Sequence, residues 1–163
     1  MQEIQIIDIL KIIAVLIALV GLFLNAWQLY QNNNFRRSEI VSNVLFKTFD
    51  DEKISKMFYK LEYDKFTYDD NFHNSKDEER LDKTLVLFNI LAKQYYMNLI
   101  TLEDIEEISY DFLTIYDNQE VQKYLKFLDN WYKNKNHKKI PFEHFRKLSE
   151  EIKKHHLKTY NKS

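Results

Sequence analysis

Cysteine is absent from the 163-residue chain, and glycine and proline occur once each. Without cysteine, a disulfide framework, a zinc finger and thiol catalysis are excluded. The single glycine is Gly21, so the chain beyond it has none of the glycines with which P-loops and dinucleotide-binding turns bring backbone amides close to phosphate. Strand-rich folds also need glycine and proline in their turns. These absences predict an all-α protein whose helices are joined by short polar links.

The near-neutral net charge of −1 conceals an uneven distribution. Residues 1–132 contain 14 Lys and Arg against 22 Asp and Glu, whereas residues 133–163 contain 10 against 3. A basic end on an acidic body suits contact with nucleic acid, with anionic lipid or with an acidic neighbouring surface. A solvated helix end explains the same composition equally well.

An apolar run extends without interruption from Ile12 to Leu24. Thirteen helical residues cover about 20 Å, and a hydrocarbon core of ~30 Å requires an extension to Ile4 and Tyr30. The extension includes Asp8 and Lys11, which can pair because they lie three residues apart on a helix. We therefore predict one transmembrane helix. The two alternatives are a cleaved signal peptide, which lacks its basic start and cleavage site here, and a buried core helix.

Basic residues flank the run on its C-terminal side. Arg36 and Arg37 follow it closely, while the N-terminal side carries Lys11 and two acidic residues. The positive-inside rule then places the N-terminus outside and the rest of the chain in the cytoplasm. The predicted location is a bacterial inner membrane, crossed once.

Small and polar residues follow one line along this helix at alternating spacings of three and four. The seam, as we call it, consists of Lys11, Ala14, Ala18, Gly21, Asn25, Gln28 and Asn32. Small residues allow helices to approach closely in lipid, and Asn or Gln can form hydrogen bonds across the interface. A polar residue in the membrane is costly unless it faces protein or water. The seam predicts self-association around a bundle axis, which a pore can follow, although chance can also produce such a match.

Amphipathic patterns after residue 34 predict a cytoplasmic helical bundle. Ser75 with Glu78 and Thr101 with Asp104 are capping-box signals, and Pro141 suits a first helical position. Apolar residues at helical spacing predict the core: Ile40, Val44, Leu45, Phe49, Ile54, Met57, Phe58, Leu61, Leu81, Leu85, Phe88, Ala92, Tyr95, Ile105, Ile108, Phe112, Ile115, Val121, Tyr124, Leu125, Leu128, Trp131, Phe142, Phe145, Leu148 and Ile152. We divide the chain into an anchor (1–34), a helical domain (35–132) and a basic C-terminal region (133–163).

Two groups of residues are candidates for chemistry or binding. The acidic group contains Glu62, Asp64, Asp69, Asp70, His73, Glu79 and Asp82. It could bind a metal or act in acid–base catalysis, but it lacks a fixed ligand spacing, and loop solvation and helix capping account for much of it. The basic group, which lies among aromatic residues as in binding sites for single-stranded nucleic acid or nucleotides, contains Lys135, Lys138, Lys139, Arg146, Lys153 and Lys154. Adjacent His155 and His156 point about 100° apart on a helix and form a poor metal pair.

Several local motifs carry a resemblance to known proteins. They are E-Y-x-x-F-x-Y at Glu62 to Tyr68, the pair Phe72-His73 before a capped helix, and the pair Leu81-Asp82. With the anchor, and over most of residues 5–132, the chain resembles a group of small bacterial single-pass membrane-anchored helical proteins. Such proteins are similar to membrane effectors of anti-phage operons, including Hailong-type channel effectors. The resemblance implies no enzymatic activity.

These observations lead to three hypotheses. The first is a homo-oligomeric membrane effector that forms or gates an ion-conducting pore, with the lipid bilayer, its own copies, a regulatory nucleic acid or nucleotide and an operon protein as partners. The second is a membrane-tethered adaptor without a pore. The third is an enzyme centred on Glu62 and His73. We favour a non-enzymatic protein without cofactor or metal.

Overall fold

The computed structural model describes residues 2–160, and every regular element among them is helical. The elements are α1 (Gln2–Asp50), α2 (Glu52–Glu62), α3 (Lys76–Tyr96), α4 (Leu102–Ile105), the 3₁₀ helix η1 (Glu106–Ile108), α5 (Ser109–Asp117), α6 (Gln119–Asn134) and α7 (Glu143–Tyr160). The all-α prediction is confirmed. The chain divides into two compact units, of which the first ends at Ser38 and the second begins at Glu39.

Helix α1 is a continuous helix of 49 residues, about 74 Å long at 1.5 Å per residue. Between Lys11 and Thr48 it contains an 18-residue window with a mean hydropathy of 2.3, none of which is buried. By length and composition α1 can therefore cross a membrane. A core helix of a soluble protein has a buried apolar face, which this window lacks. The predicted pairing of Lys11 with Asp8 lies outside the described side chains.

The second unit has one continuous core to which the end of α1 contributes Val41 and Val44. The other buried members come from every later helix and from the loops on either side of α3: Met57, Leu61, Phe66, Phe72, Leu81, Leu85, Phe88, Leu91, Ala92, Ile100, Ile105, Ile108, Phe112, Ile115, Val121, Tyr124, Leu125, Phe145, Leu148 and Ile152. Most predicted core positions are confirmed, although the side chain of Phe49 lies outside the described part. The aromatic rings of Phe88, Phe112 and Phe145 meet at the centre.

Two local predictions, the burial of Trp131 and the start of the last helix, were wrong. Trp131 is 45% exposed because the C-terminal half of α6 continues past the helices on which its first two turns pack. The predicted core positions after Thr101 lie on two α-helices, since a 3₁₀ turn, in which the Ser109 hydroxyl donates to the Glu106 carbonyl at 2.7 Å, separates α4 from α5. Helix α7 begins at Glu143 rather than Pro141, because Phe142 adopts a φ of 54° that no right-handed helix contains.

Asparagines replace glycine at the turns of this unit. Asn74 precedes α3, Asn98 follows it, and Asn136 follows α6, and all three have φ near +60°. Asparagine tolerates this left-handed conformation better than other residues with a Cβ atom. The second unit thus ends its helices sharply without a single glycine.

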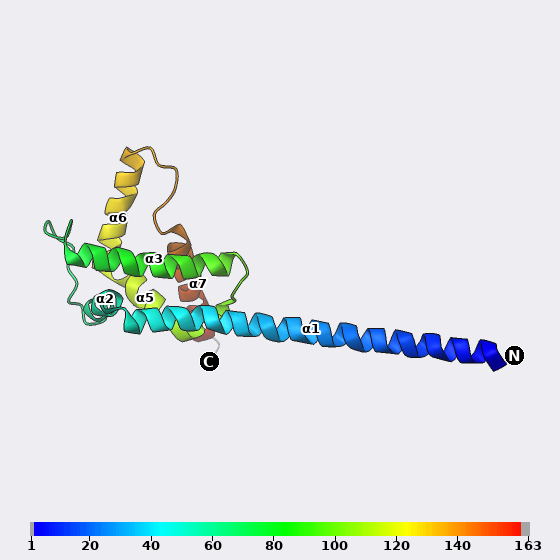
Figure 1. Ribbon diagram of the computed structural model, residues 1–163. Coiled ribbons are helices and arrows are strands. Elements are labelled where there is room, and N and C mark those ends of the chain that lie inside the picture. Colours follow the sequence, from blue (N-terminus) through cyan, green and yellow to red (C-terminus); the bar gives the residue numbers. More distant parts are fainter. Residues whose placement is uncertain (1, 161–163) are drawn as a thin grey trace. The chain divides into compact units, whose positions relative to one another are not determined.

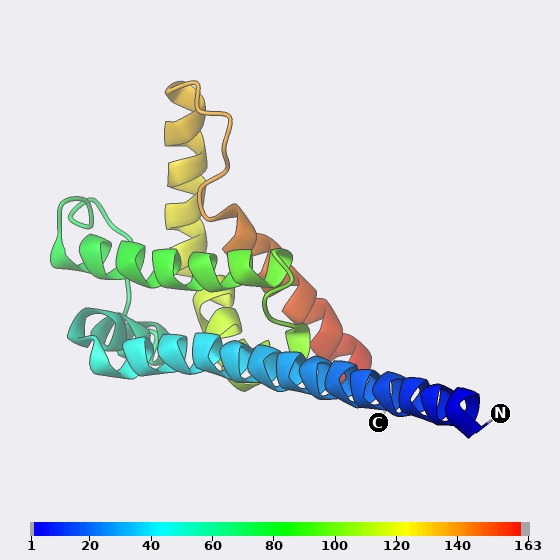
Figure 2. The same ribbon diagram turned by 45° about the vertical axis from the view of Figure 1, so that its right-hand side comes forward.

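Within the second unit, α3 packs against α2 and α7, and α5 packs against α7. Both views show the C-terminal end of α6 and the orange connection after it extending away from the other helices of this unit before the chain returns to α7 (Figures 1 and 2). This extension contains residues 133–139, the most lysine-rich stretch of the sequence.

Candidate functional site

The seam residues all lie on α1, along one face because their spacings alternate between three and four. Their side chains are exposed, except that Gly21 is half-buried. A Cβ atom built at Gly21 would meet nothing within 4 Å. The small residues of the seam are therefore not required by packing inside the chain.

Within the acidic group, His73 fastens the loop between α2 and α3. The His73 Nδ1 atom lies 2.9 Å from Oε1 of Glu78, and its Nε2 atom lies 3.0 Å from the Tyr68 hydroxyl. The other Glu78 oxygen accepts the backbone N–H of Asn74 at 2.5 Å, so it does not complete the predicted capping box. The Ser75 side chain does cap α3, accepting from the Glu78 N–H at 3.2 Å.

The remaining acidic side chains have two environments. Asp82 accepts a hydrogen bond from the Tyr124 hydroxyl at 2.7 Å, and burial raises the pKa of its carboxyl despite this bond. Glu79 forms an ion pair with Lys53 across to α2. Glu62, Asp64, Asp69 and Asp70 are exposed, as is the Glu79 side chain. Among the described residues, no three His, Asp or Glu side chains are placed to hold a metal ion.

Part of the basic group gathers in a groove of about 600 Å³ between the end of α6 and the start of α7. The basic groove, as we name it, is lined by Asp129, Tyr132, Lys133, Asn136, His137, Lys138, Lys139, Ile140, Pro141 and Arg146. Arg146 is anchored there: its Nη1 atom lies 2.8 Å from Asp129, and its Nη2 donates to the Leu125 carbonyl at 3.2 Å. The structure thus brings Lys138, Lys139 and Arg146 together.

The other predicted basic residues lie elsewhere. Lys135 is exposed at the C-cap of α6, next to the groove residues in sequence but outside the lining. Lys153 forms a 2.7 Å ion pair with Asp117, and Lys154 is exposed on α7, about two turns beyond Arg146. Aromatic rings border the groove, since the imidazole of His137 lies 6.3 Å from Trp131 and 5.2 Å from Tyr132 between ring centroids.

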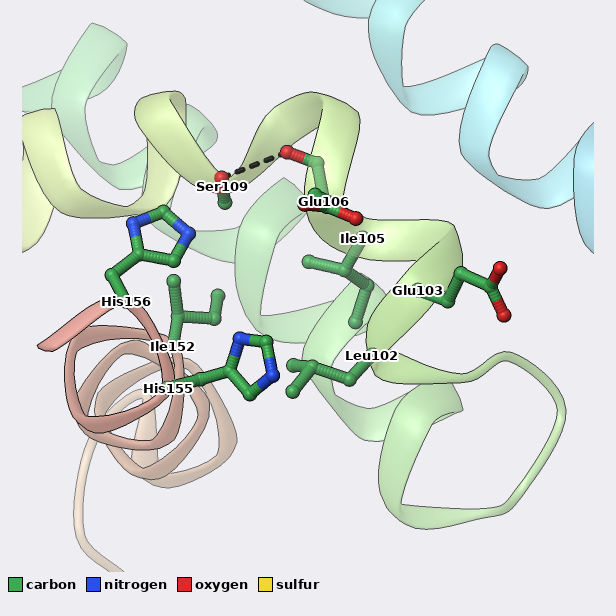
Figure 3. A pocket seen from close by; sticks show the side chains of 8 residues that line it. All are labelled: Leu102, Glu103, Ile105, Glu106, Ser109, Ile152, His155 and His156. Carbon is green, nitrogen blue, oxygen red and sulfur yellow. Dashed lines mark hydrogen bonds between the residues drawn. The ribbon is translucent and has the colours of Figure 1, made fainter. Parts of the chain in front are cut away.

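A second, smaller pocket of about 240 Å³ lies between α4, η1 and α7. Figure 3 shows the His155 ring directed toward Leu102 and the His156 ring toward Ser109, with Ile152 between them, while the Glu103 carboxylate points away. Sequence reasoning dismissed this histidine pair because adjacent residues diverge on a helix. The sequence did contain a signal for this pocket: His155 lies three residues and His156 four residues after Ile152, so both share the helix face of that buried residue.

Comparison of the chain with protein-family models, with curated proteins and with solved structures finds no match. The resemblance to membrane effectors of anti-phage operons therefore stays a prediction, based on the local motifs quoted above.

Proposed function

We propose that this protein is a single-pass membrane protein whose N-terminal helices associate along the seam into a homo-oligomer that conducts ions. Depolarisation of a bacterial inner membrane is the output, in the manner of a suicidal defence against phage. Arg36 and Arg37 orient the chain so that the second unit is cytoplasmic. There the unit assembles or gates the oligomer, by binding a ligand or an operon partner better in one state than in another.

The observation that carries the proposal is the unburied apolar window of α1. Within it lie large apolar side chains with more than half of their surface exposed, such as Ile17 and Phe23, which lipid would cover. The seam interrupts this apolar surface with the small residues Ala14, Ala18 and Gly21. Polar residues extend the seam at both ends. These small residues have no packing role inside the chain. Their presence is explained if a second copy of the helix packs closely against them.

Two substitutions test the seam. Gly21→Leu and Ala18→Leu should each abolish the oligomer in detergent, measured as particle mass, and the ion leakage of vesicles containing the protein. Neither change meets a steric obstacle within the chain, because the space around Gly21 is open and the Ala18 side chain is exposed. Leucine also has a higher helix propensity than glycine, by roughly 1 kcal/mol, so α1 itself is not weakened.

Val20→Leu and Phe23→Leu are the matched controls, since both positions face away from the seam and keep the helix apolar. They should leave mass and leakage unchanged. A monomeric wild-type protein, or equal leakage from all four variants, would contradict the proposal. A wild-type protein that is soluble without detergent would remove the membrane anchor altogether.

The basic groove favours a second candidate function, that of a membrane-tethered binding module without a pore. Its chemistry lies wholly in the second unit, so the anchor would serve only to hold it at the bilayer. Replacing residues 12–24 by polyleucine discriminates between the two functions. The tethered module would survive this replacement, whereas a seam-dependent pore would lose both oligomer and leakage.

A further inference from the structure

The lysines of the basic groove have no carboxylate partner, unlike several other lysines of the second unit. Ion pairs engage the following lysines: Lys53, Lys56, Lys60, Lys83, Lys123, Lys147 and Lys153. Among the side chains that the structure describes, Lys133, Lys138 and Lys139 form no ion pair. The one acid in the groove lining is Asp129, and Arg146 pairs with it. The groove is therefore a concave surface of uncompensated positive charge, which attracts anions.

Exposed apolar and aromatic side chains stand beside this charge. Ile140 is 53% exposed in the groove lining, and Trp131 is 45% exposed at its border. Tyr132 also lines the groove, with its ring centroid 5.4 Å from that of Trp131. Tryptophan, tyrosine and lysine together are typical of the membrane–water interface, where rings lie at headgroup level and lysines meet phosphate.

We infer that the basic groove binds the phosphate headgroup of an anionic phospholipid, with Ile140 and Trp131 inserted at the boundary of the acyl chains. Lys133, Lys138 and Lys139 supply the charge that selects anionic over zwitterionic lipid. The inference rests on the membrane location proposed above but not on the pore. A nucleic acid would use the lysines and the rings but gains nothing from an exposed isoleucine, so the combination of residues favours lipid.

Tethering makes this contact effective. A groove held near the bilayer by α1 meets headgroups at a high effective concentration, so even a weak site is occupied. The cytoplasmic leaflet, on which the orientation of the chain places this unit, carries anionic lipid. Each lysine near such a surface favours association by about fivefold, and removing two should shift the ratio of docked to undocked domains by roughly 25-fold.

The sequence contains two tryptophans, which provide separate probes of the anchor and the groove. Full-length protein carrying Trp27→Phe reports on Trp131 alone, and Trp131→Phe reports on Trp27. Each is reconstituted into phosphatidylcholine or into an equal mixture of phosphatidylcholine and phosphatidylglycerol, with bromine atoms on the acyl chains as quenchers. We expect Trp27 to be quenched in both bilayers and Trp131 only where phosphatidylglycerol is present.

Lys138→Gln/Lys139→Gln and, separately, Ile140→Ser should abolish the quenching of Trp131 while leaving that of Trp27. Lys76→Gln/Lys93→Gln removes the same charge from exposed lysines elsewhere and should change neither signal. Quenching of Trp131 in phosphatidylcholine alone, or its persistence in the groove variants, overturns the inference. If Trp27 also escapes quenching, the membrane anchor itself is refuted; if only Trp131 does, the groove alone is.

A labelled single-stranded oligonucleotide completes the test. Added to protein in phosphatidylcholine bilayers, it should show no binding that depends on Lys138 and Lys139. Binding that these two substitutions abolish would assign the groove to nucleic acid and overturn the lipid inference.

Discussion

The Tyr124 hydroxyl on α6 donates a 2.7 Å hydrogen bond to the Asp82 carboxylate on α3, joining residues 42 positions apart. Tyr124 is also fully buried, and its ring lies 5.0 Å from that of Phe72 in the loop between α2 and α3. One side chain thus fastens the loop, α3 and α6 together. Because both partners are at least partly buried, loss of either leaves a polar group without its partner.

Tyr124→Phe tests this connection. The substitution keeps the ring but removes the donor to a carboxylate, and we expect unfolding to become easier by about 1.5 to 3 kcal/mol. The measurement is the free energy of unfolding of the full chain in detergent. Tyr59→Phe is the control, since the Tyr59 side chain is 61% exposed, and it should have little effect. Equal effects of the two substitutions would show that the hydrogen bond contributes nothing.

The partly buried carboxyl of Asp111 predicts that the stability of the fold depends on pH. Burial, followed by the nearby negative charge of Glu62, raises the pKa of its carboxyl to about 6 from 3.8. The folded state therefore favours the protonated form, so this group destabilises the fold increasingly as pH rises from about 4 to about 6, and the penalty is constant above that. The carboxyl is only partly buried, and solvent screening reduces the effect to about 1 kcal/mol.

Asp111→Asn removes this titration. The variant should be more stable than wild type at pH 7 by about 1 kcal/mol, with the difference shrinking toward pH 4. Thermal unfolding of both proteins across this range measures it. A difference that stays constant with pH would mean that Asp111 titrates normally. Glu62→Gln should produce part of the same stabilisation.

Phe145 predicts how strongly the C-terminal helix is bound into the core. Its ring is fully buried and lies 5.8 Å from Phe112 between centroids. Phe145→Ala should cost about 3 to 5 kcal/mol through lost burial and the cavity that it leaves. Phe46→Ala is the control because Phe46 is 64% exposed. A shift of the melting temperature no larger than that of the control would argue that α7 is not part of the core.

The flanking arginines predict the orientation of the chain. Arg36→Glu/Arg37→Glu removes the positive charge that follows the apolar run, and we expect a mixed or inverted topology. A C-terminal reporter that is active only in the cytoplasm measures this. In the unchanged protein, the reporter should be active. Activity that is the same in both proteins would show that other features set the orientation.

The helices were predictable because the sequence contains few competing signals. Periodic apolar residues defined the core faces of α3 and α6, and Ser75 marked the start of α3, where its side chain caps the helix. These features depend on residues three or four apart, which a sequence displays directly. Turn geometry was harder to predict, as the left-handed Phe142 before α7 shows.

The candidate sites were less predictable because they depend on contacts between distant residues. We predicted the acidic group as one cluster. Instead, Glu79 pairs with Lys53 on α2, and Asp82 accepts a hydrogen bond from Tyr124 on α6. The residues of the basic group lie apart, since Lys153 pairs with Asp117, whereas Lys138 and Lys139 line one groove together with Arg146. Such pairings are set by tertiary packing, which local spacing does not encode.

The turns without glycine affect the unfolded chain as much as the folded one. A residue with a Cβ atom samples fewer backbone conformations than glycine. The unfolded chain of the second unit therefore has less conformational entropy to lose when it folds. Asn98 and Asn136 adopt their left-handed angles at a small energetic cost, which this restriction offsets. Asn98→Gly and Asn136→Gly would thus relieve local strain yet loosen the denatured ensemble, leaving the net stability almost where it started.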